Sequence, residues 1–284
     1  MALTDFLPGQ ERELKFFPVL NNHPEKLSLE QIKHFNDKGY IFPLDLFDAE
    51  EAVQQRNYFE QLLAMAIEDG RDNYSVNGFQ THCQGLYDLV CDPRILDYVE
   101  DLLGPNLICT MTHYFAKNPI DKKAVYWHQD AQFWPITPSK VVTVWIAIDD
   151  VYADNGPMQF WPGTHHKGII PFEHLGDEED GVLDQHVHQP ERFGDPVSVV
   201  LKAGQFSLHT DMLLHGSAAN ESGRRRCGLT IRYMPPDVRP SNDADPKAII
   251  ARGSDPTGYW QKVERPESEV LPPLQENKAL ETNP

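Results

Sequence analysis

The chain has 284 residues, 40% of them hydrophobic and 24% charged, a composition that supports a sizeable core and excludes wholesale disorder. Its formal net charge of -18 disfavours anionic partners, so we expect neither nucleic acid nor a membrane surface to bind it. A packed globular fold is the default expectation.

The first third of the chain carries the signals of three helices. Each begins at a serine or aspartate that can cap a helix N-terminus and ends at a glycine that can terminate one. Ser28, for example, is followed three residues later by Gln31, and the two can form a capping box. The predicted helices span about 28–39, 48–70 and 92–104. Residues 28–104 are therefore expected to form a helical N-terminal part.

From residue 107 onward the pattern changes to short runs of β-branched and aromatic residues bounded by Pro, Gly and Asn. The predicted strands are 107–116, 124–127, 141–148, 158–161, 197–201, 205–208 and 227–234. Many short strands without intervening helices predict an antiparallel sandwich or jelly roll. The fold class is thus mainly β with N-terminal helices, and the core is expected over about 105–235.

Two segments fall outside this pattern. Residues 168–194 are polar and acidic, without periodicity, and we interpret them as a long insertion between strands that acts as a lid. Residues 266–284 are rich in Pro, Glu and Asn, which predicts a mobile tail. No repeat or boundary separates a second unit, so residues 1–265 are predicted to form a single domain.

Cysteine usage and the N-terminus indicate the compartment. The four cysteines, at positions 83, 91, 109 and 227, include no Cys-x-x-Cys pair, which disfavours a zinc site and a disulfide framework. The first residues lack a cationic region followed by a long apolar one, and no apolar run reaches the roughly 18 residues of a membrane span. We therefore expect a soluble, cytoplasmic protein.

A candidate metal site begins in the sequence Trp-His-Gln-Asp at 127–130. On a strand, His128 and Asp130 lie on the same face because side chains alternate. A distant third ligand would complete a triad that leaves coordination positions open for a cosubstrate and O2, as in non-haem iron(II) oxygenases. His215, in Leu-His-Gly-Ser at 214–217, is the expected third ligand.

A second triplet, His209-Thr210-Asp211, has the same His-x-Asp pattern. No histidine follows His215, so this pair has no distant ligand downstream. A site built with His215 would crowd three ligands onto one short segment. We interpret His209 and Asp211 as hydrogen-bonding groups near the site.

Two further residues, both after His215 in the sequence, extend the pattern. Arg226 stands eleven residues further on, at the start of a predicted strand, and a guanidinium can bind a carboxylate bidentately. Ser217 can donate a hydrogen bond to the same carboxylate. Strand parity distinguishes Arg225 from its neighbours, but it does not distinguish Arg224 from Arg226.

Together these motifs resemble the phytanoyl-CoA dioxygenase-like family of iron(II)- and 2-oxoglutarate-dependent oxygenases. The matching segments are Trp-His-Gln-Asp at 127–130, Val-Trp-Ile-Ala-Ile-Asp-Asp at 144–150, Asn-Gly-Pro-Met at 155–158, Pro-Gly-Thr-His at 162–165, His-Gly-Ser at 215–217, and the arginine at 226. The match is ordered and spans roughly 28–235. The arginine of the family lies eleven residues past the last metal histidine, which favours Arg226 over Arg224.

The resemblance implies a double-stranded β-helix core in which His128, Asp130 and His215 hold iron(II). It implies a 2-oxoglutarate pocket lined by Arg226, Ser217, Gln129, Trp145 and Met111. The implied reaction uses O2, converts 2-oxoglutarate to succinate and CO2, and oxidises an unactivated C–H bond of a small molecule, by default to an alcohol. Because Asp130 keeps the carboxylate that related halogenases lack, oxygenation rather than halogenation is expected.

Four further residues are candidates for contact with the substrate: Phe133, Trp134, His82 and Arg232. Phe133 and Trp134 leave the strand at the mouth of the site, where they line the pocket or fill the core. Arg232 shares strand parity with Arg226 and is a candidate second anion site. For His82, a satisfied polar or core histidine is the preferred interpretation, and contact with the substrate is the alternative.

Two other functions stay open on the sequence alone. A cupin-like metalloenzyme that needs no 2-oxoglutarate could use the same triad, and stimulation of O2 uptake by 2-oxoglutarate would separate the two. A catalytically silent jelly-roll binding module would leave the triad and the arginine unexplained. Iron content after anaerobic reconstitution would decide that case.

Overall fold

The computed structural model describes residues 6–71, 76–174, 182–183, 185–242 and 246–273. The three predicted helices are confirmed as α1 (Leu29–Lys38), α2 (Ala49–Glu68) and α4 (Pro93–Leu103). The capping boxes at Ser28 and Asp48 are formed, and Gly39 ends α1 in the left-handed conformation. A further helix, α3 (Gln84–Val90), was not predicted, because its N-cap residue is a cysteine and gives no sequence signal.

The larger of two sheets has the strand order β1-β8-β5-β10-β2-β12-β13 and is antiparallel except at β12 and β13. Its strands are β1 (Tyr40–Asp45), β2 (Leu107–Lys117), β5 (Val142–Ala147), β8 (Gln205–Thr210), β10 (Arg226–Met234), β12 (Lys247–Arg252) and β13 (Gln261–Lys262). β1 lies in the part predicted to be helical, and β12 and β13 lie beyond residue 235. The predicted core boundaries of 105 and 235 are therefore too narrow at both ends.

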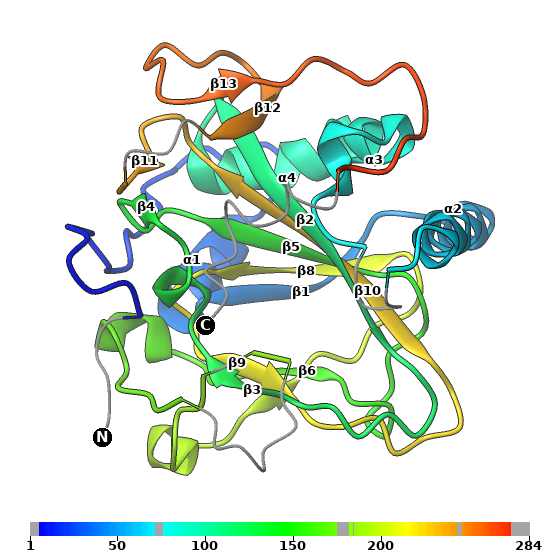
Figure 1. The fold of residues 1–284 in the computed structure, drawn as a ribbon. Coiled ribbons are helices and arrows are strands. Elements are labelled where there is room, and N and C mark those ends of the chain that lie inside the picture. Colours follow the sequence, from blue (N-terminus) through cyan, green and yellow to red (C-terminus); the bar gives the residue numbers. More distant parts are fainter. Residues whose placement is uncertain (1–5, 72–75, 175–181, 184, 243–245, 274–284) are drawn as a thin grey trace.

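The smaller sheet has the order β3-β9-β6-β7 and faces the larger one (Figure 1). Its strands are β3 (Val125–His128), β6 (Met158–Phe160), β7 (Val197–Ser198) and β9 (His215–Ser217). A short ladder joins β4 (Ile136–Thr137) to β11 (Arg239–Pro240). Two facing antiparallel sheets with helices at the N-terminal side confirm the predicted jelly-roll class.

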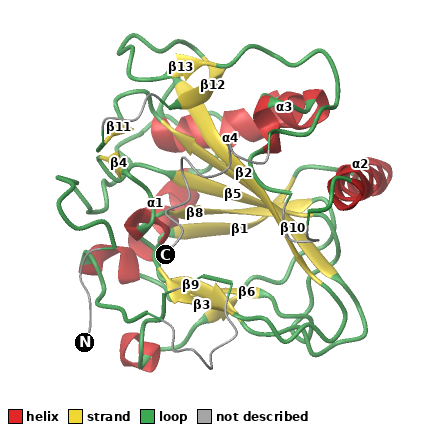
Figure 2. Ribbon diagram, viewed as in Figure 1, coloured by secondary structure: helices red, strands yellow, loops and turns green. Residues whose placement is uncertain are grey.

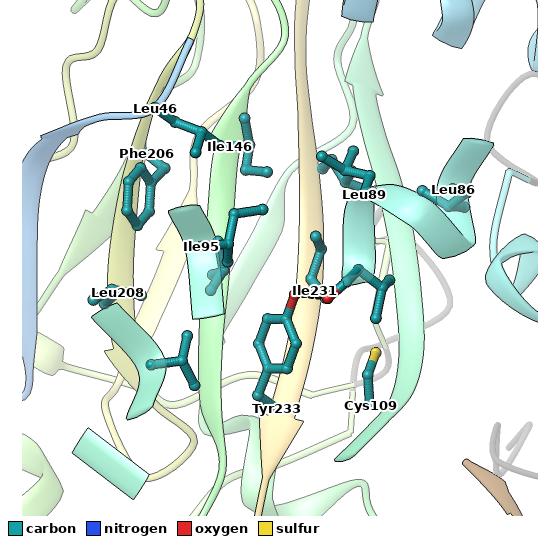
Figure 3. Close-up of a cluster of buried hydrophobic side chains, with 14 of the residues drawn as sticks. Leu46, Leu86, Leu89, Ile95, Cys109, Ile146, Phe206, Leu208, Ile231 and Tyr233 are labelled. Carbon is teal, nitrogen blue, oxygen red and sulfur yellow. Dashed lines mark hydrogen bonds between the residues drawn. The ribbon is translucent and has the colours of Figure 1, made fainter. Parts of the chain in front are cut away.

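The two faces of the larger sheet have different surroundings. On the outer face, apolar side chains of β5, β8 and β10, such as Ile146, Leu208 and Ile231, pack with residues of α3 and α4 (Figure 3). Residues of α2 belong to the same cluster. Figure 2 shows α3 and α4 on the side of this sheet away from β3, β9 and β6. The alternate side chains, including Trp145 and Ala147, point between the sheets. The space between the sheets is where the candidate site lies.

The described part of the 168–194 insertion is attached to the free edge of β3. The amide N–H of Val182 donates to the carbonyl of Ala124, and that of Val187 donates to the carbonyl of Trp127, each at 3.0 Å. Ile170 and Val187 pack with Trp127 in a separate apolar cluster. Residues 175–181 and 184 lie outside the described residues, and the action of the insertion as a lid stays a prediction.

Residues 266–273 do not form a free tail. The Glu269 carboxylate accepts hydrogen bonds of 2.8 Å from the Tyr58 hydroxyl and from the Gly85 N–H, which join this segment to α2 and α3. The predicted tail therefore begins no earlier than residue 274, and 274–284 lie outside the described residues. Within the described ranges, no helix has both the length and the apolar character needed to cross a membrane.

Candidate metal centre

The three predicted metal ligands come together between the sheets. His128 ends β3 and lies directly opposite His215, the first residue of β9, and Asp130 begins the short 3-10 helix η2 (Asp130–Gln132). The Nε2 atoms of His128 and His215 are 3.5 and 3.9 Å from Oδ1 of Asp130. All three side chains are buried. Their donor atoms lie within 4.8 Å of one another, close enough to bind a single metal ion.

The strand that was expected to carry His128 and Asp130 ends at His128. Gln129 keeps an extended backbone, with φ -114° and ψ 122°, so the alternation of side chains continues for one more residue. The chain then turns into η2, where the N–H of Ala131 donates to the Asp211 carbonyl at 3.0 Å. The expected common face is therefore reached, although Asp130 is not in a strand.

Backbone hydrogen bonds orient both histidines. Nδ1 of His128 is 2.8 Å from the Tyr126 carbonyl, and Nδ1 of His215 is 2.9 Å from the Leu213 carbonyl. A carbonyl can only accept, so each Nδ1 carries the proton and donates it. This tautomer leaves the Nε2 lone pairs directed at Asp130 and available to a metal ion.

Electrostatics also favour metal binding. Burial, and then the proximity of His128, lower the pKa of His215 to about 4, so this ring is neutral at pH 7. Burial works to raise the pKa of Asp130, but the neighbouring imidazoles of His215 and His128 and the charge of Arg232 hold it well below its usual range. The site thus offers two imidazole lone pairs and one carboxylate charge, which are hard and intermediate ligands suited to iron(II).

The side chain of Gln129 lies on the opposite face from His128 and is fully buried. Its amide nitrogen donates to the carbonyls of Gly168 and Met212, at 3.0 and 2.7 Å. Its amide oxygen accepts from the Ile170 N–H at 2.8 Å and from the Gln132 amide at 3.2 Å. All four hydrogen-bonding positions of this amide are occupied within the chain. In this arrangement Gln129 anchors neighbouring loops and does not line the pocket.

The structure distinguishes the three consecutive arginines. Arg224 pairs with Asp154 at the surface, and Arg225 pairs with Asp149 and Glu60. Arg226, the first residue of β10, is only 2% exposed and points between the sheets.

Arg226 is held beside Trp145. Its Nε donates to the Gly156 carbonyl at 3.0 Å, and its guanidinium carbon is 5.6 Å from the centre of the Trp145 ring. Trp145 can lie there because the next inward residue of β10 is Gly228, whose added Cβ would come within 1.9 Å of the ring. Directly opposite Arg226 on β2 is Lys117, a buried lysine that the sequence did not single out. Burial and the charge of Arg226 lower the pKa of Lys117 to about 7.

The other predicted pocket residues lie between the two sheets. Ser217 is two residues past His215 on β9, so its side chain shares the face of the metal ligand. Met111 is half-buried and lies opposite Arg232 on β2. The structure thus places Ser217, Trp145, Met111 and Arg226 on the inner surfaces of the two sheets.

Three of the four substrate candidates lie near the triad. The ring of Phe133 is 5.8 Å from the ring of His128, and the Trp134 ring lies 5.1 Å below the guanidinium of Arg232. Arg232 is 7% exposed and influences the pKa values of Asp130 and His215. His82 follows the short helix η1 (Phe79–Thr81), whose Phe79 belongs to the outer core, and its Nδ1 is 2.8 Å from the Thr81 hydroxyl.

The two outer residues of the second His-x-Asp triplet have different surroundings. Asp211 is a buried hydrogen-bonding group, as predicted, and its carboxylate accepts from the Ser139 hydroxyl at 2.6 Å. His209 differs: it is 1% exposed, and neither ring nitrogen has a hydrogen-bond partner within the described part of the chain. Its ring centre is 4.9 Å from that of His215, and burial lowers its pKa well below the usual range. The interpretation of His209 as a locally hydrogen-bonded residue is therefore wrong.

Residues 35–228 match the family described as Phytanoyl-CoA dioxygenase (PhyH). The chain belongs to this family. The match includes the triad and Arg226, so the resemblance drawn from the motifs is confirmed. This phytanoyl-CoA dioxygenase family member therefore has the candidate site inside the region that defines the family.

Two related proteins carry the comparison further. The chain is 29% identical over 265 residues to the probable alpha-ketoglutarate-dependent hypophosphite dioxygenase of Stutzerimonas stutzeri, an alignment covering 84% of this chain and 90% of that protein. It is 25% identical over 240 residues to the peroxisomal phytanoyl-CoA dioxygenase of Rattus norvegicus, covering 75% of this chain and 70% of that protein.

Solved structures agree on the fold. The apo form of the non-heme monooxygenase ThoJ superposes with a TM-score of 0.72 at 28% identity, covering 84% of this chain and 88% of ThoJ. EctD from S. alaskensis, solved with 2-oxoglutarate and 5-hydroxyectoine, superposes with a TM-score of 0.69 at 20% identity, covering 94% and 98%. Family, fold and triad together identify this chain as a non-haem iron, 2-oxoglutarate-dependent dioxygenase.

Proposed function

We propose that the protein hydroxylates an unactivated C–H bond of a small molecule, with iron(II) bound by His128, Asp130 and His215 and with 2-oxoglutarate bound by Arg226 and Ser217. The observation that carries the proposal is the buried triad with a buried arginine on the inner face of the opposite sheet. The relatives named above act on small molecules, which supports a substrate of that class.

The surroundings of Arg226 support a carboxylate as its ligand. Two buried cations, Arg226 and Lys117, lie side by side on β10 and β2. Arg226 donates to the Gly156 carbonyl, and Lys117 donates to the Lys123 carbonyl. A planar guanidinium binds a carboxylate bidentately, and the distal carboxylate of 2-oxoglutarate has the matching shape and the opposite charge.

The residues of this chain have distinct parts in the reaction. His128, Asp130 and His215 would hold the metal through Nε2, Oδ1 and Nε2, which meet in the space between the sheets. Bound iron supplies the activation of O2 that is coupled to decarboxylation of 2-oxoglutarate. Arg226 and Ser217 orient the cosubstrate, and Trp145 forms an apolar wall that keeps water from the carboxylate. Phe133 packs edge-on against the His128 ring and would help to exclude water from that ligand.

Oxygen consumption and succinate formation test the proposal. The protein, reconstituted anaerobically with iron(II), should consume O2 and release succinate when 2-oxoglutarate is added with a pool of small metabolites. Ser217→Ala should weaken 2-oxoglutarate binding about 10-fold, since it removes one hydrogen bond to a charged group. O2 uptake that is independent of 2-oxoglutarate would overturn the proposal and favour a cupin-like enzyme without this cosubstrate.

A further inference from the structure

A row of side chains crosses the inner face of the larger sheet below the metal triad. Residues paired directly across neighbouring antiparallel strands lie side by side on one face. The register pairs His209 of β8 with Thr143 of β5, Thr143 with Arg232 of β10, and Arg232 with Met111 of β2. Four strands therefore present one continuous row, and three of its four members are polar.

Two members of this row, Thr143 and His209, are buried with polar atoms that lack a hydrogen-bond partner among the described residues. Thr143 is 0% exposed and His209 is 1% exposed. Within the described residues, neither the Thr143 hydroxyl nor either ring nitrogen of His209 has a hydrogen-bond partner. Buried polar groups are nearly always paired, because each one left unpaired is destabilising. Three such atoms on two adjacent residues indicate a place where a ligand supplies the partners.

The row faces the metal ligands. The His209 ring lies 4.9 Å from the ring of His215, measured between centres. At the other end of the polar stretch, the charge of Arg232 lowers the pKa of Asp130. The guanidinium of Arg232 lies over the Trp134 ring, at 5.1 Å from its centre.

The row is separate from the cosubstrate end of the site. Arg226 and Arg232 are six positions apart on β10, about 20 Å of extended chain at roughly 3.3 Å per residue. They share a face, but Gly228 and Thr230, with Trp145 beside them, lie between. One small dicarboxylate cannot occupy both ends, so the row near Arg232 is available to a second molecule.

We propose that His209, Thr143 and Arg232 form the subsite for the primary substrate, and that this substrate is a small molecule carrying a carboxylate or a similar anionic oxygen group. Arg232 binds the anionic group, and His209 and Thr143 bind neighbouring polar atoms, which holds the rest of the molecule against the metal. The inference rests on the proposed function, because it takes the space beside the triad to be where the substrate is oxidised.

The test is anaerobic titration calorimetry on the full chain loaded with iron(II) and 2-oxoglutarate. The probes are carboxylic acids of about four to eight carbons, each beside its primary amide, which has the same shape and no charge. We expect acids to bind and their amides to bind at least about 30-fold more weakly, as for loss of a buried charge-assisted contact. Arg232→Met should abolish the preference for acids.

Two further variants keep the test independent of folding. Arg224→Met removes an exposed arginine that pairs with Asp154, and it should leave acid binding unchanged. Thr143→Val keeps the shape of the side chain and removes an unpaired hydroxyl, so it should weaken acid binding about 5-fold while the melting temperature stays equal or rises. A purely structural role for Thr143 would lower the melting temperature and leave the acids unaffected.

Three results would overturn the inference: amides that bind as well as acids, acids that bind Arg232→Met as tightly as the unmodified protein, or no acid of the series binding at all. Titration of 2-oxoglutarate alone separates this failure from that of the proposed function. If 2-oxoglutarate binds and the acids do not, only the substrate subsite is wrong. If 2-oxoglutarate itself does not bind to the iron-loaded protein, the proposed function fails first.

Discussion

The two faces of the larger sheet are built from alternate residues of the same strands, yet they have opposite chemistry. On β10, Leu229 and Ile231 point outward into an apolar layer covered by helices, and both are fully buried. Their neighbours Thr230 and Arg232 point inward and are buried as well, but they are polar. Burial alone therefore does not distinguish residues that stabilise the fold from residues that bind ligands.

The difference lies in how polar and charged groups are treated. The outer face holds a large cluster of apolar side chains, and each one there contributes to stability by packing. The inner face holds buried cations at Lys117, Arg226 and Arg232, and polar atoms of Thr143 and His209 that have no hydrogen-bond partner among the described residues. Burial of such groups costs free energy. Substitutions on adjacent residues of one strand should consequently separate stability from binding.

Arg226→Ala should have the largest effect on ligand binding. Removing a buried, charge-assisted contact is expected to weaken 2-oxoglutarate binding by about 2–5 kcal/mol, roughly 30-fold to several thousand-fold, while iron stays bound. Arg224→Ala is the matched control because Arg224 lies at the surface, and it should change the affinity little. Titration of the two variants measures this directly. A large loss in Arg224→Ala instead would show that the cosubstrate arginine has been misassigned.

Ile231→Ala tests the outer face of the same strand. Ile231 is 0% exposed and packs in the layer under the helices, so truncation should lower the free energy of unfolding by about 2–5 kcal/mol. Its side chain points away from the triad, and the affinities for iron(II) and 2-oxoglutarate should be unchanged when measured well below the melting temperature. Urea unfolding and ligand titration together check both halves. Weakened iron binding in a folded variant would contradict the claim that outer-face residues affect stability and not ligand binding.

The buried charge of Lys117 should make the free energy of unfolding depend on pH. Burial, and then Arg226, lower its pKa to about 7, whereas the unfolded chain keeps the proton to about pH 10. The unfolded state thus binds more protons between these values, so stability rises with pH across this window and the benefit is lost as pH falls to 7.

The measurement is urea unfolding at pH 7 and pH 9, compared with Lys117→Met. The unmodified protein should gain about 2 kcal/mol relative to the variant over this interval. Asp121 acts in the opposite sense on the same lysine but more weakly than burial. Parallel pH profiles for the two proteins would mean that Lys117 is not held in a desolvated state.

Local patterns in the sequence predicted the parts of the molecule that depend on near neighbours. Helix caps such as Ser28 with Gln31 determine α1 within a few residues, and the alternation of an extended chain brings His128 and Asp130 together. The pairing of β1 with β8 depends on residues about 160 positions apart, for example Asp45 and Gln205, so nothing near β1 marks it as a strand.

The same distinction applies to the site. Parity does not distinguish Arg224 from Arg226, whereas in the structure Arg224 precedes the strand and pairs with Asp154 at the surface. Gln129 was assigned to the pocket with its neighbours, although alternation alone points it away from His128. Whether His209 finds a hydrogen-bond partner depends on all the elements that surround it, and none is found among the described residues. No local pattern in the sequence predicts this.

The most direct test of the central claim is the iron content of two aspartate variants, reconstituted anaerobically and desalted. Each aspartate follows a histidine by two positions and each is buried, but Asp130 faces His128 and His215, whereas Asp211 bonds to Ser139. We predict one iron per chain in the unmodified protein and in Asp211→Ala, and none in Asp130→Ala, which should also lose hydroxylation. Iron retained by Asp130→Ala and lost from Asp211→Ala would contradict the assignment of the metal centre.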